Sequence, residues 1–140
     1  MLPLLRIPER LLATGPNGGG LAILPTTGGV AELHDASMTG LAAAEGVIAW
    51  CEQGAGSRIV VCRDGKLRAT SLADDDLDVH DLVLDGQAAW LVATRDNAIC
   101  RWADGRLQTV RRFADEPDSW HLNSLVRLDG RWLASHFGRF

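Results

Sequence analysis

The sequence contains no tyrosine and only three cysteines, and both scarcities restrict the kind of protein it encodes. Cys51, Cys62 and Cys100 are an odd number without a close Cys-x-x-Cys pair, which argues against a disulfide framework and a cysteine-rich zinc site. Each lies in an apolar segment, where a free cysteine behaves as a small buried hydrophobe. We therefore expect no disulfide, no metal and no cofactor.

Long apolar runs are also missing. The longest, from Ala88 to Ala93, is far shorter than the roughly 20 residues that span a bilayer as a helix. The first eight residues include two prolines and no basic segment ahead of the apolar ones, so they do not match a secretory signal. These observations predict a cytoplasmic protein without a membrane partner.

The charge balance lacks the basic excess that nucleic-acid binding requires. Fourteen Lys and Arg residues stand against eighteen Asp and Glu residues, giving a net charge of −4, and no basic stripe is present. Hydrophobic residues make up 46% of the 140 residues and charged residues 23%, which is typical of one globular domain. We expect no nucleic-acid partner.

An internal repeat is the main positive signal. Three segments begin with an apolar run led by leucine and close on glycine, and each is followed by a strand-like segment that carries tryptophan. The leading leucines are 41 and 43 residues apart. The repeated landmarks are Leu41, Leu82 and Leu125, then Gly46, Gly86 and Gly130, then Trp50, Trp90 and Trp132.

Each repeat is predicted to form four short strands. Asp64-Gly65 and Asp104-Gly105, each followed by a basic residue and leucine, indicate tight type I′ hairpins between apolar runs. Leu41–Glu45 has helical propensity, but its counterparts carry valine, which favours a strand. A four-stranded unit of about 40 to 45 residues is the signature of a β-propeller blade, with a chance similarity inside a β-sandwich as the alternative.

The predicted blades do not add up to a ring. We place an incomplete blade at about 10–38, full blades at about 39–76 and 80–115, and the start of another at 121–140. Closed propellers have 4–8 blades. The sequence therefore predicts one partial propeller domain of about three blades, either a fragment of a longer protein or a chain that self-associates through exposed edges.

One motif resembles a known family. Trp120-His121-Leu122-Asn123-Ser124-Leu125, followed by Asp129-Gly130, resembles an uncharacterised bacterial β-propeller family of unknown function in which this signature ends one blade and opens the next. The resemblance covers about residues 76–138. It implies a propeller fold and a longer full-length protein, and it implies no activity.

Polar residues near the leading leucines are the candidate site. His80 and Asn123 each stand two positions before an aligned leucine, as does Thr39, and the innermost strand of a blade begins at the mouth of the central channel. Asp81, Trp120 and His121 lie close by in the sequence. We therefore name His80, Asp81, Trp120, His121 and Asn123 as ligand-binding candidates, with fastening of loops as the structural alternative.

No catalytic signature accompanies these residues. The sequence has no Gly-x-Ser-x-Gly elbow, and the acidic run 74–78 lacks the glycine and glutamate of a calcium loop, so it is expected to be a loop between blades. These observations favour a non-catalytic binding or protein-interaction module. The alternative is a channel-centred lyase or hydrolase that uses His80, Asp81, His121 and Asn123.

Overall fold

The described part of the chain consists entirely of strands and their connections. The computed structural model describes residues 10–15, 17, 19–25, 31–34 and 36–138. Within these residues there are thirteen strands and no helix, and hence no helix long and apolar enough to cross a membrane. The strands are β1 (Arg10–Gly15), β2 (Gly20–Pro25), β3 (Ala31–His34), β4 (Met38–Ala44), β5 (Val47–Glu52), β6 (Ser57–Arg63), β7 (Lys66–Ala73), β8 (Val79–Asp85), β9 (Ala88–Ala93), β10 (Ala98–Ala103), β11 (Arg106–Arg112), β12 (Leu122–Leu128) and β13 (Arg131–His136).

These strands form four antiparallel sheets in which neighbours in the chain are neighbours in the sheet. The orders are β1-β2-β3, β4-β5-β6-β7, β8-β9-β10-β11 and β12-β13. Short connections explain this simple order, because a two-residue turn places consecutive strands side by side as an antiparallel pair. Asp64, Asp104 and Asp129 all have φ near +50° and are each followed by a glycine of positive φ, as a type I′ turn requires.

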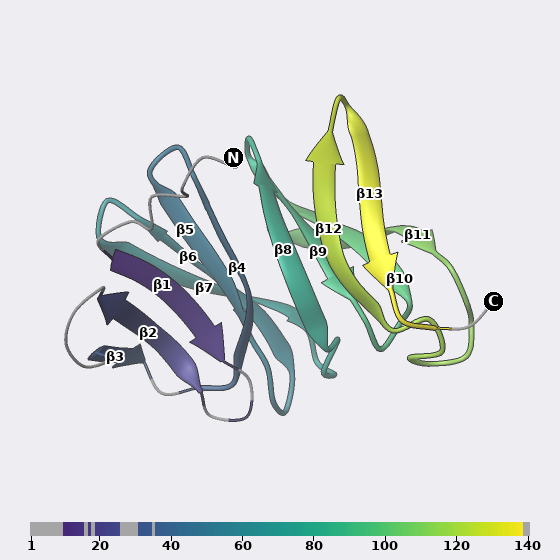
Figure 1. The fold of residues 1–140 in the computed structure, drawn as a ribbon, viewed down its shortest axis with the longest axis horizontal. Coiled ribbons are helices and arrows are strands. Elements are labelled where there is room, and N and C mark those ends of the chain that lie inside the picture. The colour runs from purple at the N-terminus through teal and green to yellow at the C-terminus, as the bar shows by residue number, and fades with distance from the viewer. Residues whose placement is uncertain (1–9, 16, 18, 26–30, 35, 139–140) are drawn as a thin grey trace, which may run out of the picture.

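The sheets stack through their first strands. β4 contacts β8, β8 contacts β12, and each later first strand also touches the second strand of the sheet before it. Figure 1 shows the sheets side by side, with β4, β8 and β12 in succession across the molecule. The all-β expectation is confirmed, whereas the four sheets, as far as they are described, do not close into a ring.

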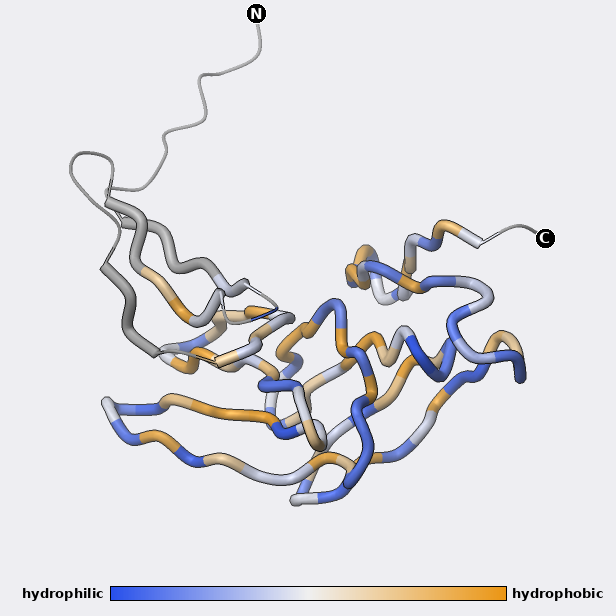
Figure 2. Tube along the Cα trace, turned by 90° about the horizontal axis from the view of Figure 1, so that it is seen from below, coloured by the Kyte–Doolittle hydropathy of each residue, from blue (hydrophilic) through white to orange (hydrophobic). Residues whose placement is uncertain are grey.

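The core lies between the sheets, because each sheet contributes alternate apolar residues to the layer beside it. Ile59 and Cys51 of one complete sheet meet Leu91 and Val79 of the next, and all four are at 0% exposure. Figure 2 shows apolar residues along the strands and polar residues concentrated at the turns. Close packing of this kind fixes the spacing of the first strands and therefore positions everything that projects from their ends.

The modules of the repeat differ from one another in two details. The connection after β8 is Gly86-Gln87, so Gly86 takes the first turn position while Gly46 and Gly130 take the second. The three tryptophans also differ, since they stand fourth, third and second in β5, β9 and β13. Trp90 and Trp132 consequently face each other across two sheets, with ring centroids 4.6 Å apart.

Candidate functional site

The candidate site is built on a β-bulge that recurs at the beginning of the first strands. The register of β4 shifts between Thr39 and Leu41, that of β8 between Val79 and Asp81, and that of β12 between Leu122 and Ser124. A bulge breaks the alternation of side chains and redirects one of them. The residue left unpaired by the bulge is His80 in β8 and Asn123 in β12, whereas in β4 it is Gly40. Thr39 matches His80 and Asn123 only in its distance from the following turn.

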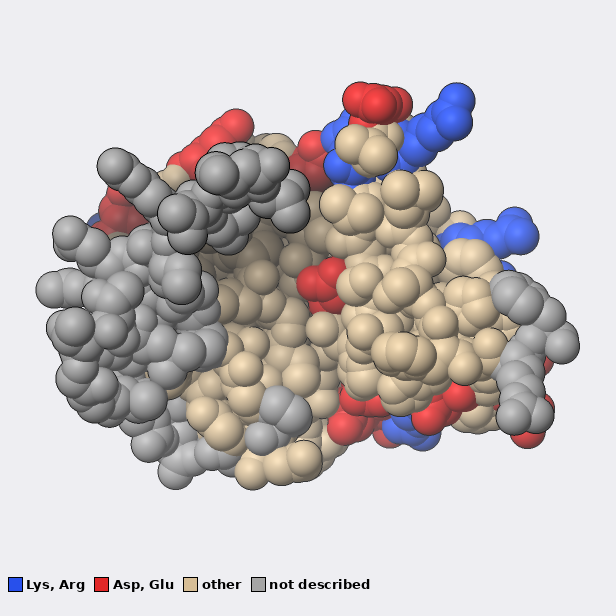
Figure 3. Space-filling view, in the orientation of Figure 1, with Lys and Arg blue, Asp and Glu red and all other residues tan. Residues whose placement is uncertain are grey.

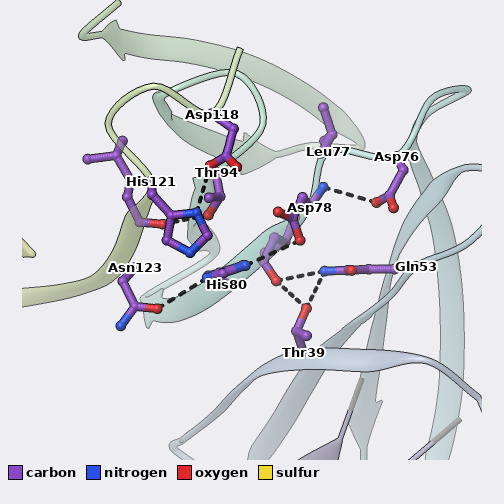
Figure 4. Close-up of polar contacts among 12 residues, drawn as sticks. Thr39, Gln53, Asp76, Leu77, Asp78, His80, Thr94, Asp118, His121 and Asn123 are labelled. Atoms are coloured by element: carbon purple, nitrogen blue, oxygen red, sulfur yellow. Dashed lines mark hydrogen bonds and ion pairs between the residues drawn. The ribbon is translucent and has the colours of Figure 1, made fainter. Parts of the chain in front are cut away.

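His80 is the centre of the site. Its Nδ1 lies 3.1 Å from Oδ1 of Asn123 on the neighbouring strand, and its Nε2 lies 3.3 Å from Oδ1 of Asp78. Both contacts are visible in Figure 4, where the imidazole bridges from β8 to β12. The His80 side chain is 24% exposed, so it lies at the surface while held by a partner on each nitrogen.

A second imidazole stands directly beside the first. His121 contacts His80 edge to face, with ring centroids 5.0 Å apart and planes at 85°. Its Nδ1 lies 2.7 Å from Oδ1 of Asp118, and its side chain is 38% exposed. The structure thus brings together three of the predicted residues, His80, His121 and Asn123, and gives each imidazole its own carboxylate.

Thr39 and Gln53 fasten the preceding sheet to the same place. The Gln53 amide donates to the carbonyl of Val79 at 2.7 Å, and the Thr39 hydroxyl donates to the same carbonyl. Thr94 repeats this arrangement one sheet later by donating to the carbonyl of Leu122 at 2.5 Å. These bonds join consecutive sheets, which supports a role for Thr39 in holding the structure together rather than in binding a ligand.

Two predicted residues lie elsewhere. Asp81 accepts hydrogen bonds from the backbone N–H of Leu82 at 2.8 Å and of Leu125 at 2.7 Å, so its carboxylate joins β8 to β12. Trp120 packs against Phe113 and the ring of His136, with centroids 5.3 and 5.1 Å away. Both residues hold the sheets and the connecting loop in place, and neither joins the imidazole pair.

Sequence reasoning missed the residue that orients the loop carrying His121. Asn97 is fully buried in a left-handed conformation with φ of +47°. Its side-chain amide donates to the carbonyl of Glu116 at 2.5 Å, and its side-chain oxygen accepts from the N–H of Trp120 at 2.8 Å. The signal was an asparagine in a short connection between two strands, where positive φ is common.

A cavity of about 680 Å³ opens beside His80. The residues that line it include Ser37, Thr39, Gln53, Asp76, Asp78 and His80. Asp76 also accepts hydrogen bonds from the Asp78 N–H at 3.0 Å and from the Ser57 hydroxyl at 3.4 Å, which orders the acidic loop before β8. Pockets of this size accommodate small molecules, and this one combines hydrogen-bond donors and acceptors with a similar amount of apolar surface.

Among the described residues, neither a metal-binding cluster nor a cysteine lies at the cavity. No group of three or more His, Cys, Asp or Glu side chains among the described residues is arranged to hold a metal ion. Cys51 and Cys100 are buried, and burial raises the pKa of both thiols, that of Cys51 to about 12. A thiol with a raised pKa is a poor nucleophile at neutral pH.

Comparison of the sequence with models of protein families and with curated proteins finds no match. The geometry of the described residues is therefore the basis for any functional assignment.

Proposed function

We propose that this chain is a non-catalytic binding module whose sheets are blades of a β-propeller and whose ligand site is the cavity beside His80. The observation that carries the proposal is that His80, which lines the cavity, is contacted by Asn123 of the next first strand and by His121 of the loop before that strand. In a propeller the first strands surround the central channel, so equivalent residues at their ends face a common ligand.

The contacts between sheets support the propeller arrangement. Each first strand touches the first strand of the next sheet. In three of the sheets, the backbone N–H after the second strand donates to the carbonyl just before the first strand of the same sheet. That bond recurs as Gln53 to Ser37, Thr94 to Asp78 and Phe137 to His121. A repeated bond at a repeated position indicates equivalent modules rather than a chance likeness between strands.

The chemistry of the lining indicates a small polar ligand. The cavity presents an imidazole, amide and hydroxyl groups and the two carboxylates of Asp76 and Asp78, and its described lining contains no lysine or arginine. Such a set of groups suits hydroxyl or amine groups better than an anion, because an anion would meet two carboxylates.

A binding experiment tests this proposal. We expect that, in a calorimetric panel of polyols, primary amines and carboxylates, a polyol or amine binds with one site per chain. His80→Ala and Asn123→Ala should each weaken binding at least about tenfold. Ser124→Ala is the matched control, because its side chain is exposed and bonds only Ser135 across the hairpin. Absence of saturable binding, or equal loss in the control, contradicts the proposal.

The second candidate is a channel-centred lyase or hydrolase, and one observation favours it. Two imidazoles in contact, each with its own carboxylate, are an arrangement in which one ring accepts a proton and the other donates one. Chemical analysis of any ligand found in the panel discriminates the two functions. Conversion that is lost in His121→Asn supports the enzyme, and recovery of the unaltered ligand supports the binding module.

A further inference from the structure

As far as the structure describes the chain, β13 has one unpaired edge, unlike the equivalent strands of the preceding sheets. β5 and β9 are the second strands of their sheets, and each is paired on both sides. β13 is also a second strand, but among the described residues it pairs only with β12. Four of its six residues are exposed, whereas the equivalent strand β9 is almost wholly buried. Among the described residues, the edge of β13 that faces away from β12 is therefore unpaired.

The unpaired edge of β13 presents its backbone N–H and C=O groups in a defined register. Leu128 and Arg131 flank the two-residue turn and form a hydrogen-bonded pair in a type I′ hairpin. Alternation along the ladder then directs the backbone groups of Trp132 and Ala134 away from β12. The equivalent residues of β9, Ala89 and Leu91, stand opposite residues of β10 in the complete sheet.

This edge also lacks the charges that protect the other edges of the molecule. The outer strand β7 carries Lys66 and Arg68. The outer strand β11 carries Arg106, Arg111 and Arg112. Positive charge on an edge strand discourages pairing with another chain. β13 carries its single arginine at its first residue, and the segment from Trp132 to Ser135 is uncharged.

The width of the neighbouring sheet determines what fits there. The sheet β8–β11 packs against β12 and is two strands wider than the sheet β12–β13, and Figure 1 shows β10 and β11 extending beyond β13. A second copy joined edge to edge would bring its own four-stranded sheet into the space that β10 and β11 occupy. An isolated pair of strands has no such obstacle.

The charges on the neighbouring sheet favour one kind of partner at the unpaired edge of β13. Arg101, Arg106 and Arg111 are exposed on the face of β10 and β11 that carries Ile99 and is directed toward β12. Arg112 is also exposed, but it stands opposite Ala98 on the other face and pairs with Asp96. Figure 3 shows blue Lys and Arg side chains on the side of the molecule where these strands and β13 lie. A strand pair placed over them gains from carboxylates and loses from further cations.

We propose that the free edge of β13 binds an acidic β-hairpin, which adds its first strand antiparallel to β13 and restores a four-stranded sheet. The inference rests on the blade repeat of the proposed function and does not depend on the cavity beside His80. The main-chain hydrogen bonds of Trp132 and Ala134 supply the affinity, and the arginines of β10 and β11 supply the charge preference.

The test uses two peptides with the sequence of residues 97–112, which form the hairpin β10–β11 in this chain. One is the native sequence, and in the other Arg101, Arg106, Arg111 and Arg112 are replaced by glutamate. Hydrogen exchange of the full chain should show at least about tenfold protection of the Trp132 and Ala134 amides with the acidic peptide, and less with the native one.

Ala134→Pro is the decisive variant, because proline removes an outward N–H while the pairing with β12 needs none from that residue. It should abolish the protection by the peptide yet retain the exchange pattern of β4–β11.

Protection of β7 or β11 in place of β13, or no protection with either peptide, overturns the proposal. If the amides of β13 are protected in the absence of peptide and this protection decreases on dilution of the chain, a second copy occupies the edge, and this result also overturns the proposal. A failed ligand panel with successful hairpin binding would refute only the cavity function.

Discussion

At the scale of single residues, Asn97 contributes most to the geometry of the site without taking part in it. It bonds both ends of the loop that carries Trp120 and His121, and it is one of the few fully buried polar side chains among the described residues. A buried polar group that bonds loop backbone stabilises one conformation, because any other conformation leaves it unsatisfied.

Asn97→Ala should destabilise the fold by about 2–4 kcal/mol, since it removes two buried hydrogen bonds and places alanine at positive φ. Urea unfolding followed by tryptophan fluorescence measures the change. Asn97→Gly tolerates the φ and should recover part of the loss. Equal stabilities of the alanine variant and the unsubstituted chain would show that the loop is held by other contacts.

Cys51 makes stability depend on alkaline pH. Burial raises the pKa of its thiol from 9.0 to about 12, so above pH 9 the unfolded state loses a proton that the folded state keeps. The free energy of unfolding should therefore fall between pH 9 and 12, by roughly 1.4 kcal/mol per pH unit from this group at most. The absence of tyrosine and the single lysine leave few other groups that titrate there.

Urea titrations at pH 8 and pH 10.5 measure this effect, and Cys51→Ala is the control that removes the titrating group. The alanine variant starts from a lower stability, because it leaves a small cavity, but its stability should change less with pH. An identical pH dependence in both chains would assign the alkaline loss to other groups.

At the scale of strands and turns, the bulge at the start of β4 depends on a glycine. Gly40 has φ of +58°, and a Cβ there would lie 3.1 Å from Cβ of Leu82 and 3.2 Å from the backbone of Asp81. The first strands approach each other closely at this point, so a side chain would push β4 away from β8.

Gly40→Ala should destabilise the fold by about 1–3 kcal/mol and disturb the contacts of Thr39. Thermal unfolding measures the stability, and Gly46→Ala is a control with positive φ but open space around its Cβ. If the two substitutions cost the same, the effect comes from backbone strain alone and the close approach of β4 to β8 contributes nothing.

The sequence predicted the strands well because they are short, apolar and separated by Asp-Gly turns with a single favoured geometry. Leu41–Ala44 is a strand as expected, and β12 and β13 lie where the last incomplete module was placed. The repeated tryptophans lie on β5, β9 and β13 as expected, but at different positions along those strands, because a bulky residue can fill the space between sheets from several strand positions. The repeat in the sequence predicts where the strands lie, but it does not predict which residues each core side chain contacts.

The candidate site was only partly predictable for a related reason. The spacing of His80 and Asn123 from their leucines identified equivalent strand positions, and equivalent positions meet where first strands stack. Asp81 and Trp120 are close in sequence to those residues, but the bulge and the loop direct them to other contacts. Alternation along a strand separates neighbours, so closeness in sequence was a poor guide.

At the scale of the whole molecule, the sheet β12–β13 leaves an apolar face uncovered. Val126 and Leu133 lie opposite each other across the hairpin and are 55% and 49% exposed. Their equivalents in the preceding sheet, Val83 and Trp90, are packed against the core cluster that includes Leu122 and Leu125. A face of this kind promotes association because covering it removes apolar surface from water.

We therefore expect the purified chain to associate at micromolar concentration. Light scattering should give a mass above the 15.1 kDa of one chain, and Val126→Asp should lower the mass toward that value. Leu67→Asp, at a leucine on β7 that is 66% exposed, is the control and should leave association unchanged. A monodisperse monomer without any substitution contradicts this expectation.

The central claim is that His80 and His121, from different elements, face one ligand at the mouth formed by the first strands. The most direct measurement is imidazole nitrogen NMR of the full chain during titration with the polyol or amine that binds in the panel. The account predicts that the resonances of both rings change along one saturation curve with one dissociation constant, and that Asn123→Ala weakens both together. Changes confined to one ring, or to residues remote from the cavity, would contradict it.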